Sequence, residues 1–252
     1  MLVLHFGPCY ADTPLSGKYP MASRTAESAP RARTRAIRAP RRLRWLAYDR
    51  FQQQLLASRI RPGQFVSQRE LAALTGLPLG AIREVIPRLE AEGLLRTVPQ
   101  RGLQIATVDV RLVRNAFELR LTLEKEAAAR FALSATDAQL DKLEAAHRDI
   151  IKRAQRGVTP ALLDAAQAVD WGLHETMIDA LGNEIISAIY RVNSLRIRLI
   201  RLDRVTLNEQ ALAPAMEEHM AFLAALRTRD PWKASVAIEA HLTSARNRAL
   251  GL

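Results

Sequence analysis

The first half of the chain contains three segments in which apolar residues recur with a helical period. Residues 45–57 form the first segment, which ends before Pro62-Gly63, and residues 78–92 form the third. The second is short and starts at Ser67-Gln68-Arg69-Glu70, a capping box in which the Ser67 hydroxyl accepts a helix N–H and the Glu70 carboxylate accepts the Ser67 N–H. We therefore expect three helices, and the second ends at Gly76, which can adopt the left-handed conformation that follows a helix end.

A β-hairpin is predicted after the third helix. Residues 94–98 and 103–107 have the pattern of two short strands, and Pro99-Gln100-Arg101-Gly102 joins them with a glycine at the tip. Helix, capped helix, tight turn, helix and hairpin, in this order, are typical of a winged helix-turn-helix. We assign this domain to residues 41–107.

The second half of the chain has no strand signal and predicts six amphipathic helices. They run near residues 109–132, 136–156, 160–180, 183–204, 208–229 and 231–249. Asp109, Thr136, Thr159 and Asp230 stand where N-caps are needed, and Pro231 follows the last of them at the first helical position. The fold class is therefore mainly α, with an all-α bundle over residues 108–252.

The composition agrees with a helical protein. Aromatic residues make up 5% of the 252 residues, and the chain has 11 glycines and 12 prolines. The single Cys9 excludes a disulfide scaffold. No apolar stretch approaches the roughly 20 residues that cross a bilayer, and the opening run of residues 1–4 is too short for a signal peptide. We expect a cytoplasmic protein with no membrane partner.

The positive charge is concentrated at the start of the chain. The formal net charge is +11, and residues 1–50 carry 10 basic and 3 acidic side chains. Residues 1–40 mix Pro, Ser, Thr and Arg without a period, which predicts a disordered basic tail. Such an arm favours an anionic polymer as partner over a small acidic substrate. The arginines between Arg31 and Arg44 either bind phosphates or only solubilise the tail.

The motifs of both halves resemble a known family. The first half resembles the DNA-binding domain of GntR transcription factors, and the second resembles the FCD ligand-binding domain of the FadR subgroup. The matching residues are Arg61–Gln64, Ser67–Ala72, Gly76-Leu77, Ile82–Val85 and Arg88–Leu94, then Glu118-Leu119-Arg120, Glu124, Asp170, His174, Asn183, His219 and His241. The resemblance covers residues 45–250 and implies a transcriptional regulator that is not an enzyme. The chain departs from it at Pro78-Leu79-Gly80, where the family has a polar run, and at Pro87 inside the recognition helix.

Three arginines and the wing glycine are the candidate DNA contacts. Arg69 begins the capped helix, Arg83 lies on the recognition helix, and Arg101 stands beside Gly102 in the wing. Arginine binds phosphate as well as the edge of guanine, so double-stranded operator DNA is the expected partner. Arg88 lies deeper in its helix, where we expect a pair with Glu84 or Glu92 instead.

Three histidines and one acid are the candidate metal ligands. Asp170 and His174 are four residues apart and share a helix face, while His219 and His241 lie amid apolar neighbours on the last two helices. One such histidine is usually a hydrogen-bonded core residue, but the four together suit Zn²⁺, Ni²⁺ or Mn²⁺. The resemblance assigns the same four positions to a metal. His147 and His5 have no such group of candidate ligands around them in the pattern, and we do not include them in the metal site.

The effector-binding candidates are polar residues on two helices of the bundle. Arg120 lies among apolar residues, and its match in the family lines the ligand cavity, where an arginine holds a carboxylate with two hydrogen bonds. The alternative is a structural ion pair of Arg120 with Glu124 or Glu126. Asn193 and Arg196 are further candidates on a later helix.

The sequence thus predicts a repressor that binds a DNA palindrome as a homodimer and responds to a small carboxylate. The alternative is a metal-dependent hydrolase built on the bundle, with Glu175 or Glu218 as the base, since a metal alone does not exclude catalysis. The winged head favours the regulator.

Overall fold

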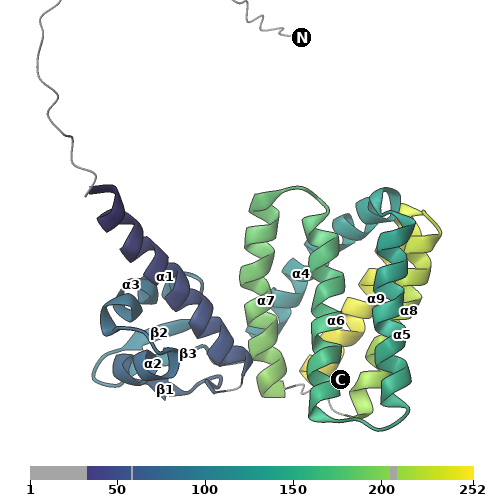
Figure 1. Cartoon of the computed structure of the whole chain (residues 1–252). Helices are drawn as coiled ribbons and strands as arrows, with labels where there is room; N and C mark the ends of the chain where they lie inside the picture. The colour runs from purple at the N-terminus through teal and green to yellow at the C-terminus, as the bar shows by residue number, and fades with distance from the viewer. Residues whose placement is uncertain (1–32, 58, 205–208) are drawn as a thin grey trace, which may run out of the picture.

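The computed structural model describes residues 33–57, 59–204 and 209–252, which form an N-terminal head and a C-terminal helical bundle side by side (Figure 1). Most of the predicted tail, residues 1–32, lies outside the described residues. Helix α1 spans Arg33–Leu56, so the prediction of a tail up to residue 40 is wrong for residues 33–40. Ala and Arg favour a helix there by propensity, but they carry no apolar period that pattern analysis can detect.

The head is a winged helix-turn-helix, as the pattern predicts. Helices α2 and α3 span Gln68–Thr75 and Leu79–Ala91 and pack with α1 around a common apolar core. The strands are β1 (Phe65–Val66), β2 (Leu95–Val98) and β3 (Gly102–Ile105), paired antiparallel in the order β1-β3-β2. The two-residue strand β1 is too short to show a period and was not predicted.

The local interactions that the sequence predicts at the start of α2 and in the wing are present in the head. The Ser67 hydroxyl accepts from the Glu70 N–H at 3.1 Å, and the Ser67 N–H donates to the Glu70 carboxylate at 2.6 Å. Gly102 at the base of the wing has φ +91°, and a Cβ there would lie 3.1 Å from the Val66 carbonyl oxygen. Helix α3 continues through Pro87, so the proline does not break the recognition helix.

The described residues of the bundle form six helices, each within two residues of its predicted bounds. They are α4 (Val110–Ser134), α5 (Asp137–Ala154), α6 (Pro160–Asp179), α7 (Glu184–Arg204), α8 (Glu209–Arg227) and α9 (Pro231–Leu250). The predicted N-caps Asp109, Thr136, Thr159 and Asp230 all accept backbone N–H groups of the following turn. No helix of the described residues is long and apolar enough to cross a membrane.

Helix α7 belongs to both domains. Its Leu195 and Leu199 are buried in the apolar core of the head. Its Ile197 and Ile200 are buried against the bundle helix α4 and the C-terminal part of α9. Figure 1 shows α7 at the edge of the bundle that faces the head. A change in the position of α7 therefore disturbs packing on both sides.

Candidate metal centre

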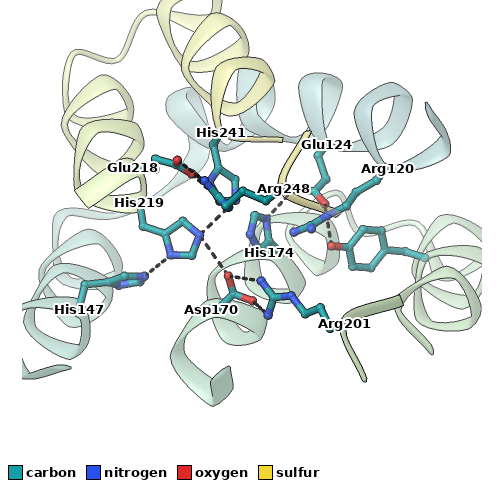
Figure 2. A network of polar contacts seen from close by, with 11 residues as sticks. Arg120, Glu124, His147, Asp170, His174, Arg201, Glu218, His219, His241 and Arg248 are labelled. Atoms are coloured by element: carbon teal, nitrogen blue, oxygen red, sulfur yellow. Dashed lines mark hydrogen bonds and ion pairs between the residues drawn. The ribbon is translucent and has the colours of Figure 1, made fainter. Parts of the chain in front are cut away.

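The four predicted metal ligands meet inside the bundle (Figure 2). Asp170 and His174 lie one turn apart on α6, while His219 extends from α8 and His241 from α9. Each side chain offers one ligand atom, and these atoms lie within 4.8 Å of one another. All four residues are buried. The structure thus brings together the complete predicted set.

The three imidazole rings direct their Nε2 atoms toward one another. The Nε2 atoms of His219 and His241 are 3.2 Å apart, and His219 Nε2 is 3.3 Å from Asp170 Oδ1. His174 Nε2 has no hydrogen-bond partner among the described residues. A neutral imidazole carries one N–H, so the location of that proton decides whether Nε2 is a donor or a ligand.

Carboxylates fix the proton on two of the rings. His174 Nδ1 is 2.6 Å from Glu124 Oε2, and His241 Nδ1 is 2.9 Å from Glu218 Oε2. An ionised carboxylate only accepts, so each Nδ1 carries the proton and donates it. The Nε2 atoms of these two rings are left with lone pairs that face the centre, which is the arrangement of a metal-binding histidine.

The third ring contacts a histidine that the sequence analysis set aside. His147 on α5 is buried, and its Nε2 lies 3.1 Å from His219 Nδ1. His147 does not offer a ligand atom to the group of four, in agreement with its omission from the predicted ligands, but it contacts the group through His219. The two residues are 72 positions apart, so no local spacing pattern indicates the contact.

The protonation states suit a cation. Burial and the charge of Arg120 lower the pKa of His174 to about 4, although Glu124 opposes this shift. Burial and the neighbouring His241 lower the pKa of His219 well below its ordinary value. Burial raises the pKa of Asp170, but the charges of Arg201 and Arg120 outweigh burial and hold this pKa well below its ordinary value, so the carboxylate is ionised. Neutral imidazoles and ionised carboxylates are the forms that bind metal ions.

The donor set fits a transition-metal ion. Bonds of about 2.0–2.1 Å to Zn²⁺ place tetrahedral ligand atoms about 3.4 Å apart. The separations of 3.2 Å between His219 and His241 and 3.3 Å between His219 and Asp170 are close to this value. Three nitrogen ligands with one oxygen ligand also suit Ni²⁺ and Mn²⁺.

The carboxylate of Asp170 and the two carboxylates that hold the histidine rings are each paired with an arginine. The pairs are Arg120 with Glu124, Arg201 with Asp170 and Arg248 with Glu218. Arg201 contacts both oxygens of Asp170, at 2.8 and 3.3 Å. Burial raises the pKa of Glu124, but the charge of Arg120 and the hydrogen bonds from His174 and Arg120 hold it at about 2. Arg201 and Arg248 carry no sequence signal that separates them from other helix arginines.

The effector candidates have different surroundings. Arg120 forms the predicted alternative ion pair with Glu124, yet its Nη2 has no partner in the described part of the chain. Asn193 is buried and donates to the Ala116 carbonyl at 2.9 Å. Arg196 lies at the boundary with the head, where its Nη2 donates to the Glu92 carbonyl at the end of α3, at 2.7 Å. The assignment of Arg196 to the effector stays a prediction.

The candidate DNA contacts lie on the surface of the head. Arg69, Arg83 and Arg101 are exposed on α2, α3 and the wing. The Arg83 Nε donates to Gln68, and the Arg101 guanidinium lies 4.1 Å above the Phe65 ring. Gly102 is partly buried in β3.

Arg88 has the structural role that we expect from its spacing. Its Nε donates to Glu92 at 2.9 Å, and its guanidinium lies 3.7 Å above the Tyr48 ring. The contact with Tyr48 of α1 holds α3 against that helix.

Both residues expected as the base of the hydrolase alternative are held in ion pairs. Glu218 accepts hydrogen bonds from His241, Ser244 and Arg248, and they outweigh the effect of burial and lower its pKa to about 2. Glu175 forms an ion pair with Arg198 at 3.5 Å.

Comparison with known proteins agrees with this result. The "Bacterial regulatory proteins, gntR family" model matches residues 46–105, and the "FCD domain" model matches residues 115–244. The repressor GlaR of Escherichia coli K12 is 24% identical over 203 residues, which are 79% of this chain and 90% of that protein. The Nta operon regulator of Aminobacter aminovorans is 26% identical over 183 residues, which are 72% of this chain and 82% of that protein.

A solved structure shares the fold. E. coli McbR/YncC superposes with a TM-score of 0.68 at 17% identity and covers 83% of this chain and 97% of its own. Because the FCD domain alone matches just over half of the chain and follows the gntR domain in the expected order, the hydrolase prediction is overturned. This protein belongs to the GntR family of DNA-binding transcriptional regulators, carries an FCD domain and is not an enzyme.

Proposed function

We propose that the bundle holds one divalent transition-metal ion at Asp170, His174, His219 and His241. The observation that carries this proposal is the mutual approach of imidazole Nε2 atoms whose protons lie on the opposite nitrogens. Lone pairs that face one another in a buried site repel, and a cation between them replaces this repulsion with bonds. When bound, the ion supplies positive charge and coordination positions for a ligand.

The effector in this proposal is a small carboxylate. The three arginine–carboxylate pairs are each neutral, so the ion adds two positive charges that these pairs do not balance. Buried donors without a partner also remain among the described residues, namely Arg120 Nη2, Trp171 Nε1 and Arg198 Nε. The Arg120 and Arg198 guanidinium groups lie 5.9 and 4.7 Å from the Trp171 ring. An anion satisfies these donors together with the ion.

The head binds operator DNA in the cytoplasm, as a homodimer on a palindrome. Arg69, Arg83 and Arg101 contact phosphates or base edges, and Gly102 keeps the wing close to β1. A repressing role is supported by GlaR, which is named as a repressor. Effector binding then releases the operator.

Helix α7 is the connection between the two events. Its Arg201 holds Asp170 of the metal centre, and its Arg196 holds the Glu92 carbonyl at the end of the recognition helix. A ligand that moves α7 therefore changes the position of α3. The resulting change in operator affinity is limited to the difference in the ligand's affinity for the two states.

Fluorescence anisotropy with labelled DNA from the region upstream of the gene tests this function. The wild-type protein loaded with Zn²⁺ should bind that DNA above random DNA, and one of a panel of small carboxylic acids should release it. Arg83→Ala is expected to lose about 1–3 kcal/mol of operator binding with its circular dichroism unchanged. Arg153→Ala, which removes an exposed arginine of the bundle instead, is the matched control. Equal affinity of wild type and Arg83→Ala would contradict the assignment of α3.

A further inference from the structure

His147 lies beside the metal centre and contacts His219, but it does not contribute a ligand atom. Its Nδ1 is 2.7 Å from the Leu143 carbonyl oxygen, one turn earlier on α5, and its Nε2 is 3.1 Å from His219 Nδ1. The two rings meet edge to face, with centroids 5.1 Å apart. Figure 2 shows His147 on the side of His219 that faces away from Asp170 and His241.

The direction of the hydrogen bonds follows from the chemistry of each atom. A backbone carbonyl only accepts, so His147 Nδ1 must carry a proton and donate it. A neutral His147 then has a lone pair on Nε2 and accepts from His219 Nδ1–H. The chain of bonds ends at His219 Nε2, which is left with its lone pair directed at the centre.

The other tautomer of His219 is disfavoured by the same contact. If the His219 proton moved to Nε2, the Nδ1 lone pair would face the lone pair of His147 Nε2 at 3.1 Å. In a buried pair, two facing acceptors lose their hydrogen bond and repel. The contact with His147 thus favours the ion-binding tautomer. It acts against the Asp170 Oδ1 and His241 Nε2 atoms, which lie 3.3 and 3.2 Å from His219 Nε2 and can accept a proton there until an ion lies between them.

We propose that His147 is a positioning residue of the metal centre, which selects the tautomer and orientation of His219. The inference rests on the proposed metal site. His174 and His241 are held by ionised glutamates that arginines neutralise, whereas His219 is held by a neutral ring. An uncharged acceptor needs no further arginine to neutralise it.

The test compares three variants with the wild-type full chain. His147→Phe keeps a ring but removes the acceptor, and we expect a 10- to 100-fold loss of affinity for Ni²⁺ or Zn²⁺ in competition with a chelator. His147→Gln offers an amide oxygen in place of Nε2, and it should recover most of that affinity. Ile150→Val, a buried change on the same helix, is the matched control and should leave metal affinity unchanged.

The tautomer is read in the metal-free protein by ¹⁵N–¹H correlation of the imidazole rings. The His219 proton should lie on Nδ1 to a larger extent in the wild type and in His147→Gln than in His147→Phe, where it should shift toward Nε2. This spectrum does not depend on metal binding. A wild-type protein that binds no metal contradicts the proposed function, whatever the tautomer. A His147→Phe protein with wild-type metal affinity and a wild-type His219 tautomer overturns the role of His147 while the proposed function stands.

Discussion

The buried pair of Arg120 and Glu124 allows a prediction with a calculable size. Both side chains are almost fully buried on α4, and Glu124 also accepts from His174 and from the Tyr190 hydroxyl. Replacing Arg120 with methionine keeps much of the side-chain volume and leaves the carboxylate without its cation. We expect this substitution to destabilise the bundle severely.

The expected loss is that of a buried ion pair from which one partner is removed. The charge of Arg120 holds the pKa of Glu124 at about 2 against the effect of burial, compared with 4.5 for the free side chain, so the ionised carboxylate stabilises the fold above pH 4.5. Removing one partner of a buried ion pair costs about 3–5 kcal/mol. For a chain of this size the melting temperature should then fall by about 6–20 °C.

The loss should depend on pH in a defined direction. In the wild type, the lowered pKa of Glu124 stabilises the fold above pH 4.5, and this contribution disappears as the pH falls from 4.5 toward 2. Without Arg120, burial favours the protonated acid and the pKa rises. The folded variant then takes up a proton that the unfolded chain does not, so its deficit relative to the wild type is smaller at pH 5 than at pH 7.

Urea denaturation at pH 7 and pH 5, followed by circular dichroism, measures both effects. Arg130→Met is the matched control, because it breaks the pair with Glu126 at the same helical spacing on the same helix but on the surface. An exposed pair of this kind contributes about 0.3–0.5 kcal/mol. If Arg120→Met cost no more than Arg130→Met at pH 7, or if its deficit did not shrink at pH 5, the electrostatic account of this pair would be refuted.

Three further substitutions test other parts of the structure. Gly102→Ala places a methyl group 3.1 Å from the Val66 carbonyl at φ +91°, so the melting temperature should drop by the equivalent of about 1–3 kcal/mol, with weaker DNA binding as a second readout. Arg196→Met removes the donor to the Glu92 carbonyl. Urea denaturation should show a loss of about 1 kcal/mol in the free energy of unfolding, while effector affinity stays unchanged. A loss of effector affinity would place Arg196 in the ligand site instead. Asp230→Ala removes the cap that accepts from Trp232 and Lys233, and thermal unfolding should show a loss of about 1 kcal/mol, against none if the cap is unimportant.

Much of the fold is predictable because its signals are local. Capping residues such as Thr136 and Asp230, and the left-handed Gly76, mark helix ends through contacts within one turn. The metal ligands were predictable because Asp170 and His174 share a face and because histidine is rare in this chain. Helix α1 begins before its apolar period does, and β1 has two residues, so neither boundary leaves a pattern.

The rest of the site depends on contacts between distant segments. His147 meets His219 across two helices, and Arg201 reaches Asp170 from α7. Arg196 lies on the same helix as Asn193 but points to the head instead of the bundle. Helical spacing gives the angle between two side chains on one helix, and it does not say which neighbour each of them faces.

The most direct test of the central claim is the metal content of the chain. Protein purified without a histidine tag is incubated with Zn²⁺, Ni²⁺ or Mn²⁺, dialysed and subjected to elemental analysis. We expect about one ion per chain in the wild type and close to none in the double variant His219→Ala with His241→Ala. A wild-type protein that remains metal-free after incubation with each of the three ions would contradict the account and leave the four residues as polar groups of the bundle core.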